Sequence, residues 1–226
     1  MINMYFDTEF TGLRAKTDLL SIGLLIGKRF FYAEITDVDV SEETVGKETI
    51  GFLKKEVFPG FLYGKVSNER LFEYTSQGTV VVDTKEEVSK NLIEFLFKYI
   101  NVNPKSMICP VSDVMYYDMV LFMDLLNTYQ PKTKEEYEKT KRVRSAVSPA
   151  GIDINDMIMK IDHVDAYTAF DTNREEFLDR INPDNPASMF PGKKHNALYD
   201  ARVIKAIYES EASLSYVAKV QSFANE

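Results

Sequence analysis

The most informative segment of the chain is Met4-Tyr5-Phe6-Asp7-Thr8-Glu9-Phe10-Thr11-Gly12. Its β-prone side chains alternate in the way that a strand requires, and Thr11-Gly12 ends the pattern. Successive side chains of a strand point to opposite faces, so Asp7 and Glu9 share one face. Acidic residues are depleted in strands, and two carboxylates on one face repel each other unless a cation lies between them. An edge strand with solvated acids is the plainer interpretation.

The segments that follow predict a mixed sheet flanked by helices. Residues 18–26 are nearly all apolar and predict a central strand, and the connection at 27–29 leads into a third strand at 30–35. Three antiparallel strands therefore open the fold. Helical periodicity covers 42–57, 85–99 and 116–126, with a short buried strand at 106–111 and a last helix from 197 past 207. This alternation predicts the α/β class in one domain that spans residues 1–226.

Composition narrows the class of protein. The chain has 27 basic and 35 acidic residues, a net charge of −8, which argues against broad nucleic-acid binding through a basic face. No window approaches the roughly eighteen apolar residues of a membrane helix, and the N-terminus does not resemble a signal peptide. The single Cys109 lies in an apolar stretch and reads as a small buried side chain. We therefore expect a cytoplasmic protein that does not bind membranes.

A second group of functional residues lies near the other end of the chain, in Lys194-His195-Asn196-Ala197-Leu198-Tyr199-Asp200-Ala201-Arg202. His195 precedes a predicted helix start, and Asp200 lies five residues later, within that helix. A histidine in the loop before the helix can reach the same cleft as Asp200. His163 has no comparable context and is interpreted as a surface residue.

These two segments resemble a known family. Asp7-Thr8-Glu9-Phe10-Thr11-Gly12-Leu13 is similar to the first motif of the DnaQ-like, or DEDDh, superfamily of 3′→5′ exonucleases, and His195-Asn196-Ala197-Leu198-Tyr199-Asp200-Ala201 is similar to the third. Within that superfamily, the first third of the chain and the last motif most resemble the mycobacterial-type small exoribonucleases related to RNase T and oligoribonuclease. The resemblance implies an RNase H-like fold with a five-stranded mixed sheet. Residues 131–192 match nothing in the family and are expected to be an insertion.

The second motif of the superfamily has to be chosen among three nearby acids. Tyr117-Asp118 followed by apolar residues is similar to it, which makes Asp118 the preferred third carboxylate. Asp113 competes because it directly follows the predicted strand, and Asp124 is a weaker alternative. The choice between Asp118 and Asp113 stays open at this point.

The resemblance implies a phosphodiesterase reaction at 3′ ends of single-stranded nucleic acid, with RNA favoured over DNA and nucleoside 5′-monophosphates as products. Asp7, Glu9, Asp118 and Asp200 would hold two Mg²⁺ ions, for which Mn²⁺ could substitute, since carboxylates favour these hard cations. His195 would serve as general base. Phe10, Thr11 and Leu13 would contact the terminal nucleotide, although core packing is an equal interpretation of Phe10. Similar enzymes are often homodimers.

Two other functions fit the same residues. A catalytically silent RNase H-like module would bind nucleic acid or a protein partner, and an unrelated phosphohydrolase would act on free nucleotides. Lys193, Lys194 and the basic segment 132–144 are candidates for phosphate contacts, with solvated surface as the plainer interpretation for each.

Overall fold

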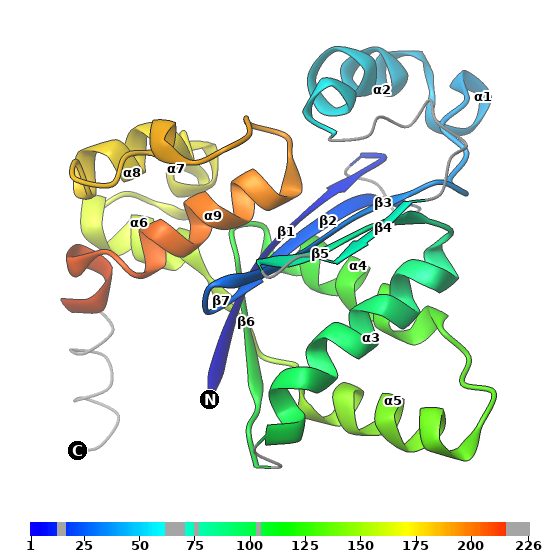
Figure 1. Cartoon of the computed structure of the whole chain (residues 1–226). Helices are drawn as coiled ribbons and strands as arrows, with labels where there is room; N and C mark the ends of the chain where they lie inside the picture. The colour runs from blue at the N-terminus through cyan, green and yellow to red at the C-terminus, as the bar shows by residue number, and fades with distance from the viewer. Residues whose placement is uncertain (13–16, 62–70, 75–76, 103–104, 216–226) are drawn as a thin grey trace.

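The computed structural model of the chain describes residues 1–12, 17–61, 71–74, 77–102 and 105–215. A seven-stranded sheet runs through this described part in the order β4-β5-β3-β2-β1-β6-β7 (Figure 1). β1 pairs antiparallel with β2 and parallel with β6, and β2 pairs antiparallel with β3. The strands are β1 Ile2–Phe10, β2 Leu19–Ile26, β3 Arg29–Ile35, β4 Leu71–Tyr74, β5 Gly78–Asp83, β6 Ile108–Ser112 and β7 Ile152–Asp153.

The α/β class, the mixed sheet and the three antiparallel opening strands are confirmed. The expected count of five strands is wrong. The β-branched run in β5 pairs parallel with β3, and β4 pairs antiparallel with β5, so a hairpin widens the sheet beyond β3. β7 is only two residues long and pairs with the end of β6, which is too short a strand for any periodicity to reveal.

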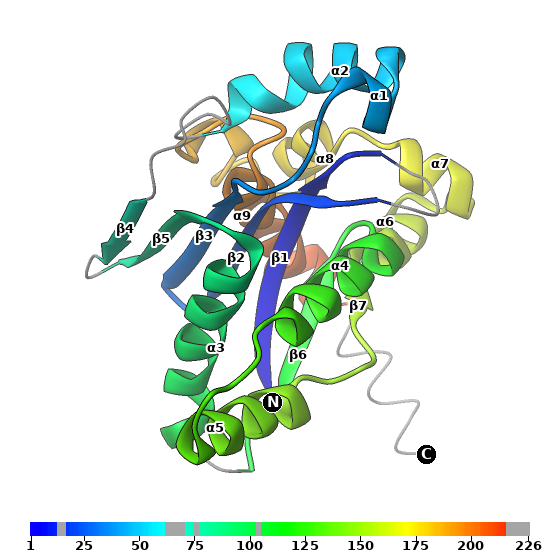
Figure 2. The same ribbon diagram turned by 90° about the vertical axis from the view of Figure 1, so that its right-hand side faces the viewer.

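Helices cover both faces of the sheet (Figures 1 and 2). One face carries α3 Lys85–Val102, α4 Met115–Thr128 and α5 Lys134–Ala146, and the other carries α6 Ile154–Asp162, α7 Ala166–Asp171, α8 Arg174–Ile181 and α9 Ala197–Tyr208. β1 divides its side chains between the two cores: Met4 and Phe6 pack with the α3 and α4 side, whereas Tyr5 packs with the α9 side. By the same alternation, Asp7 and Glu9 face α9.

The predicted helix at 42–57 is divided. Gly46 has a φ of 86° and separates α1 Glu42–Val45 from α2 Lys47–Phe52. A π-helical turn, η1 Leu53–Val57, and a 3-10 turn, η2 Phe58–Gly60, continue α2. Glycine adopts this backbone without steric cost, so the break was set by one residue inside an otherwise helical pattern. These short helices stand at the end of the sheet where β1 ends (Figure 2).

Residues 151–192, which belong to the expected insertion, contain three helices, α6 to α8. Each begins at an Asp or Asn whose side chain accepts a hydrogen bond from a backbone N–H of the first turn: Asp153, Asp165 and Asn173. Asp and Asn are typical of turns and of helix caps alike, so these residue types alone do not mark the helix starts in the sequence.

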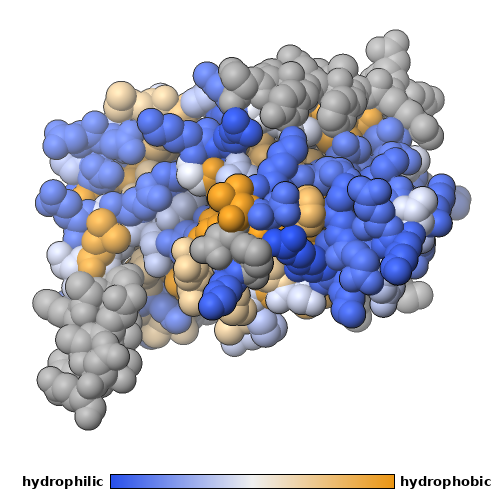
Figure 3. Space-filling view, turned by 60° about the horizontal axis from the view of Figure 1, so that its bottom comes forward, coloured by the Kyte–Doolittle hydropathy of each residue, from blue (hydrophilic) through white to orange (hydrophobic). Residues whose placement is uncertain are grey.

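The basic segment at 132–144 forms α5, and several of its cations bind neighbouring elements. Lys139 pairs with Glu94 at 2.6 Å, and Arg144 donates to the carbonyl oxygens of Leu126 and Tyr129. The face of the molecule over α3 and α5 is largely hydrophilic (Figure 3). α5 lies at the opposite end of the molecule from α2 and α7 (Figures 1 and 2). No helix in the described part of the chain is long and apolar enough to cross a membrane.

Candidate active site

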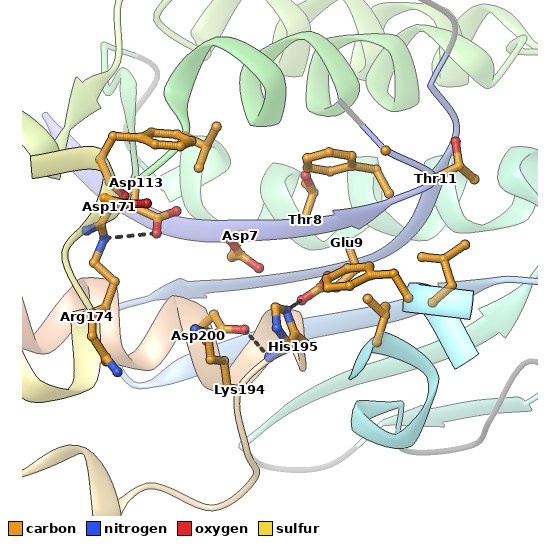
Figure 4. A pocket seen from close by; sticks show the side chains of 18 of the residues that line it. Asp7, Thr8, Glu9, Thr11, Asp113, Asp171, Arg174, Lys194, His195 and Asp200 are labelled. Carbon is orange, nitrogen blue, oxygen red and sulfur yellow. Dashed lines mark hydrogen bonds and ion pairs between the residues drawn. The ribbon is translucent and has the colours of Figure 1, made fainter. Parts of the chain in front are cut away.

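A cavity of about 930 Å³ opens at the end of β1 (Figure 4). Asp7 and Glu9 of β1 lie at its base. One wall is apolar and comes from α2 and η1, with Phe52, Leu53 and Val57. The opposite wall is mostly polar and comes from the end of α7, the link that follows it and the start of α8, residues 170–175. The cavity therefore joins an acidic base to one wall that suits an aromatic group and one that suits charge.

The carboxylates at the base form two groups that share Asp7. One oxygen from each of Asp7, Glu9 and Asp200 can be chosen so that all three lie within 4.8 Å of one another. The same holds for Asp7, Asp113 and Asp118. Asp7 is 9% exposed, and it has no hydrogen bond or ion pair within the described residues. A buried carboxylate without a partner is costly, and a cation held among these oxygens would offset that cost.

α9 reaches this cluster because β2 carries a glycine at the crossing point. Gly23 pairs with Asp7 across the β1–β2 register, and a Cβ added to Gly23 would lie 2.2 Å from the backbone nitrogen of Leu198. Only a residue without a side chain allows the start of α9 to lie this close to the sheet. The close approach brings Asp200, in the first turn of α9, beside Asp7.

His195 lies in the loop before α9 and points into the cavity (Figure 4). Its φ is 64°, an uncommon backbone conformation for a residue other than glycine. Its backbone N–H donates to Oδ2 of Asp200 at 2.9 Å, and its Nδ1 lies 3.8 Å from Oε1 of Glu9. The ring of Phe52 meets the imidazole edge-on at 5.8 Å. The strained backbone is therefore held by one site carboxylate while the side chain faces another.

Asn196 fixes the same loop from the other side. Its Oδ1 accepts from the backbone N–H of Tyr199 and caps α9, and its Nδ2 donates to the carbonyl oxygen of Gly60 at 2.7 Å. A Cβ on Gly60 would lie 2.3 Å from the carbonyl oxygen of His195. The end of η2 and the His195 loop therefore fit together as one unit, which ties the apolar wall to the acidic base.

The three candidates for the second motif are placed differently. Asp118 is 1% exposed, accepts from Thr8 Oγ1 at 2.5 Å and from the hydroxyl of Ser112, and does not line the cavity. Asp113 lines the cavity. Asp124 forms an ion pair with Lys85 and lies in neither carboxylate group. The structure thus brings both Asp118 and Asp113 to Asp7 and leaves Asp124 outside.

Burial and mutual repulsion both raise the pKa values of the carboxyl groups in the acidic cluster. Burial raises the pKa of Asp7 well above its usual range, and the carboxylates of Asp118 and Asp200 raise it further. Burial, followed by the charge of Asp113, raises the pKa of Asp118 to about 8. Burial and the charge of Glu9 raise the pKa of Asp200. Burial is the largest cause of each shift and the neighbouring carboxylates add to it, so a cation bound among these oxygens would lower all three pKa values.

The residues expected to contact a nucleotide or its phosphates differ in whether they line the cavity. Phe10 lines the cavity and also stacks on Tyr117, with ring centroids 5.8 Å apart. Thr11 borders the cavity, but its side chain is buried and accepts from the backbone N–H of Asp18 at 2.9 Å. Leu13 lies outside the described residues. Lys194 lines the cavity, whereas the exposed Lys193 does not.

The sequence interpretation missed three contributors to the site. Gly23 lies in an apolar strand where nothing marks it as a crossing point. Phe52 is 51% exposed at the end of α2, and that exposure is visible only in the fold. Arg174 opens α8 and reaches Asp113. Comparison with known proteins adds no identification, since no family model matches the chain and no curated protein matches it.

Proposed function

We propose that the protein is a metal-dependent 3′→5′ exonuclease of the DnaQ-like type, with an RNase H-like fold, that acts on single-stranded nucleic acid. The observation that carries this proposal is the pair of carboxylate groups that share Asp7 at the base of a cavity that also contains His195. The motif resemblance supplies the direction of the reaction and favours RNA over DNA. Nucleoside 5′-monophosphates are the products of such a reaction.

The residues present fit two Mg²⁺ or Mn²⁺ ions. The donors are carboxylate oxygens, which these hard cations prefer, and Asp7 lacks a partner within the described residues. Asp7, Glu9 and Asp200 would hold one ion, and Asp7 and Asp118 would contribute to the other. Two such ions supply the charge that activates water and stabilises the leaving oxygen during cleavage of a phosphodiester.

His195 acts as general base in this proposal. Its imidazole is 29% exposed, so it can meet both a water molecule in the cavity and the solvent that removes the proton. Glu9, at 3.8 Å from Nδ1, stabilises the imidazolium that forms when the proton arrives. The hydrogen bond from the His195 backbone to Asp200 keeps the base beside the reacting atoms.

The apolar wall favours the terminal nucleoside. Phe52 and Leu53 of this wall, together with Phe10 at the end of β1, present aromatic and aliphatic surface to the cavity. Stacking on such surfaces tolerates every base, since every base has a π-face. A wall of this kind suits an enzyme that removes 3′ nucleotides without reading their sequence.

The test of the base compares the two histidines of the chain. His195→Asn should lower the rate of 3′-nucleotide release by about 10²–10⁴-fold, the usual contribution of a general base, and leave Mn²⁺ affinity nearly unchanged. His163→Asn is the matched control, because His163 is exposed and also has a positive φ, 57°, which asparagine tolerates. A His195→Asn variant with the parental rate from pH 6 to pH 9 would refute this role.

A further inference from the structure

The helical region 151–192, for which no role could be assigned from the sequence, reaches the acidic site through Arg174. The guanidinium donates to the carbonyl oxygens of Ala169 and Thr172 at 2.9 and 2.6 Å, which fixes it to the end of α7. Another nitrogen donates to Oδ1 of Asn155 on α6 at 2.7 Å. Nε then meets Oδ2 of Asp113 at 3.2 Å, and the two side chains are only 15% and 18% exposed. Arg174 therefore joins three helices to the end of β6.

Asp113 reaches Asp7 through the parallel pairing of β1 with β6. Tyr5 is the register partner of Val111, and continuing that register by two residues takes Asp113 alongside Asp7. The backbone of Asp113 is held as well, because Nδ2 of Asn155 donates to its carbonyl oxygen. Both the chain and the side chain of Asp113 are thus fixed beside the base of the cavity (Figure 4).

The two oxygens of Asp113 differ in a way that points to a ligand. Oδ2 accepts from Arg174, whereas Oδ1 is buried and has no hydrogen-bond partner within the described residues. Asp7 is nine-tenths buried, lines the cavity and forms no hydrogen bond with the described residues. By contrast, both oxygens of Asp118 accept hydroxyl hydrogen bonds from Thr8 and Ser112. The free oxygens of this group therefore belong to Asp7 and Asp113.

We infer that Asp113 is a direct ligand of a divalent cation between Asp7 and Asp113, with Arg174 as the residue that positions it; this inference rests on the proposed function. Asp113 lies outside the motifs on which the resemblance to the DnaQ-like superfamily depends. Asp118 is the third carboxylate of the same group and is held by its two hydroxyl donors. A carboxylate held at one oxygen by a fixed donor is oriented to offer its other oxygen to a metal.

Charge supports the same assignment. The cluster contains the five carboxylates of the two groups, Asp7, Glu9, Asp113, Asp118 and Asp200. Two divalent cations and the guanidinium of Arg174 balance five negative charges, whereas two divalent cations alone leave one unbalanced in a mostly buried site. Arg174 is thus the counter-charge that allows a fifth acid at this centre.

Mn²⁺ titration of the full chain tests the inference without relying on catalysis. Electron paramagnetic resonance of free Mn²⁺ counts bound ions and gives their affinities. The parent should bind two ions. Asp113→Asn, which keeps shape and volume, should lose one site or weaken it by at least about tenfold, and Arg174→Met should weaken that same site by about 10–100-fold with the other unchanged. A general loss of structure would weaken both sites together.

The matched control is the other Asp–Arg pair of this region. Arg180 meets Asp162 at 2.6 Å, away from the cavity, so Asp162→Asn and Arg180→Met should leave both sites unchanged. A parent that binds two ions and shortens RNA, together with an Asp113→Asn variant that binds two ions at parental affinity, would overturn this inference alone. A parent that binds no Mn²⁺ would overturn the proposed function with it.

Discussion

Replacing Gly23 by alanine should disable the site from a position that touches no substrate. The added Cβ would lie 2.2 Å from the backbone nitrogen of Leu198, whereas ordinary contacts begin at 3.4 Å, so the start of α9 must retreat by the difference, about 1.2 Å. The atoms in the way are backbone, including the carbonyl carbon of Ala197 at 2.3 Å, and cannot rotate aside. Asp200 and the His195 loop would move with the helix.

The expected loss follows from that displacement. A shift of about 1 Å in catalytic groups can cost about 10²-fold in rate, which corresponds to about 2.7 kcal/mol of activation free energy. Overpacking should also lower the free energy of unfolding by about 1–3 kcal/mol. The assay measures 3′-nucleotide release at saturating Mg²⁺, together with Mn²⁺ affinity and the thermal midpoint, so that a folded but misaligned protein is recognised.

Gly51→Ala is the matched control, because Gly51 is exposed on α2 and an added Cβ meets nothing within 4 Å. It should keep the parental rate and, as a helix-favouring change, the parental stability or slightly more. A Gly23→Ala variant with parental rate and parental Mn²⁺ affinity would refute the argument that this glycine sets the position of α9.

Three further predictions follow from the site. The pKa of Asp118 is about 8 in the folded chain and near 4 when unfolded, so the folded state holds more protons and the free energy of unfolding falls as pH rises from about 4 to about 8. In EDTA, the thermal midpoint should be higher at pH 5 than at pH 8, and Mn²⁺ should raise it at pH 8; a midpoint independent of pH would contradict the electrostatic argument. Thr8→Val removes a hydroxyl donor to Asp118 and should weaken Mn²⁺ binding by about 10–100-fold in calorimetry, whereas Thr79→Val, at a buried threonine of β5, should not. Phe52→Ala should raise KM for an oligonucleotide by about tenfold while kcat falls less, from a stacking loss of about 1–3 kcal/mol; an unchanged KM would exclude this wall as the base site.

Local patterns in the sequence predicted the elements that carry the site. The alternation in β1 placed Asp7 and Glu9 on one face, and the helix start predicted after His195 allowed this residue to reach the same cleft as Asp200, as the structure has them. Both predictions depend only on neighbours within a few residues. The class of the fold followed from the same short-range signals.

The rest depended on contacts between distant segments. Asp113 lies beside Asp7 because β1 and β6 pair in parallel, and no periodicity within either strand specifies that register. Arg174 comes from a region whose Asp and Asn caps resemble turns. Gly23 looks like an ordinary strand residue in the sequence, and only the structure shows that α9 crosses β2 at this position. Each of these features depends on tertiary contacts. The full set of residues in the acidic cluster was therefore less predictable from the sequence than the two motifs that contribute to it.

Digestion of matched 5′-labelled single-stranded RNA and DNA tests whether the protein is a metal-dependent 3′→5′ exonuclease. With Mg²⁺ or Mn²⁺, the parent should give a ladder that shortens by single nucleotides from the 3′ end, faster on RNA, while EDTA or the Asp7→Ala variant abolishes it. Binding of either strand without shortening would indicate a silent binding module instead. No ladder on either strand, or a ladder that Asp7→Ala produces equally well, would contradict the proposal of a metal-dependent exonuclease.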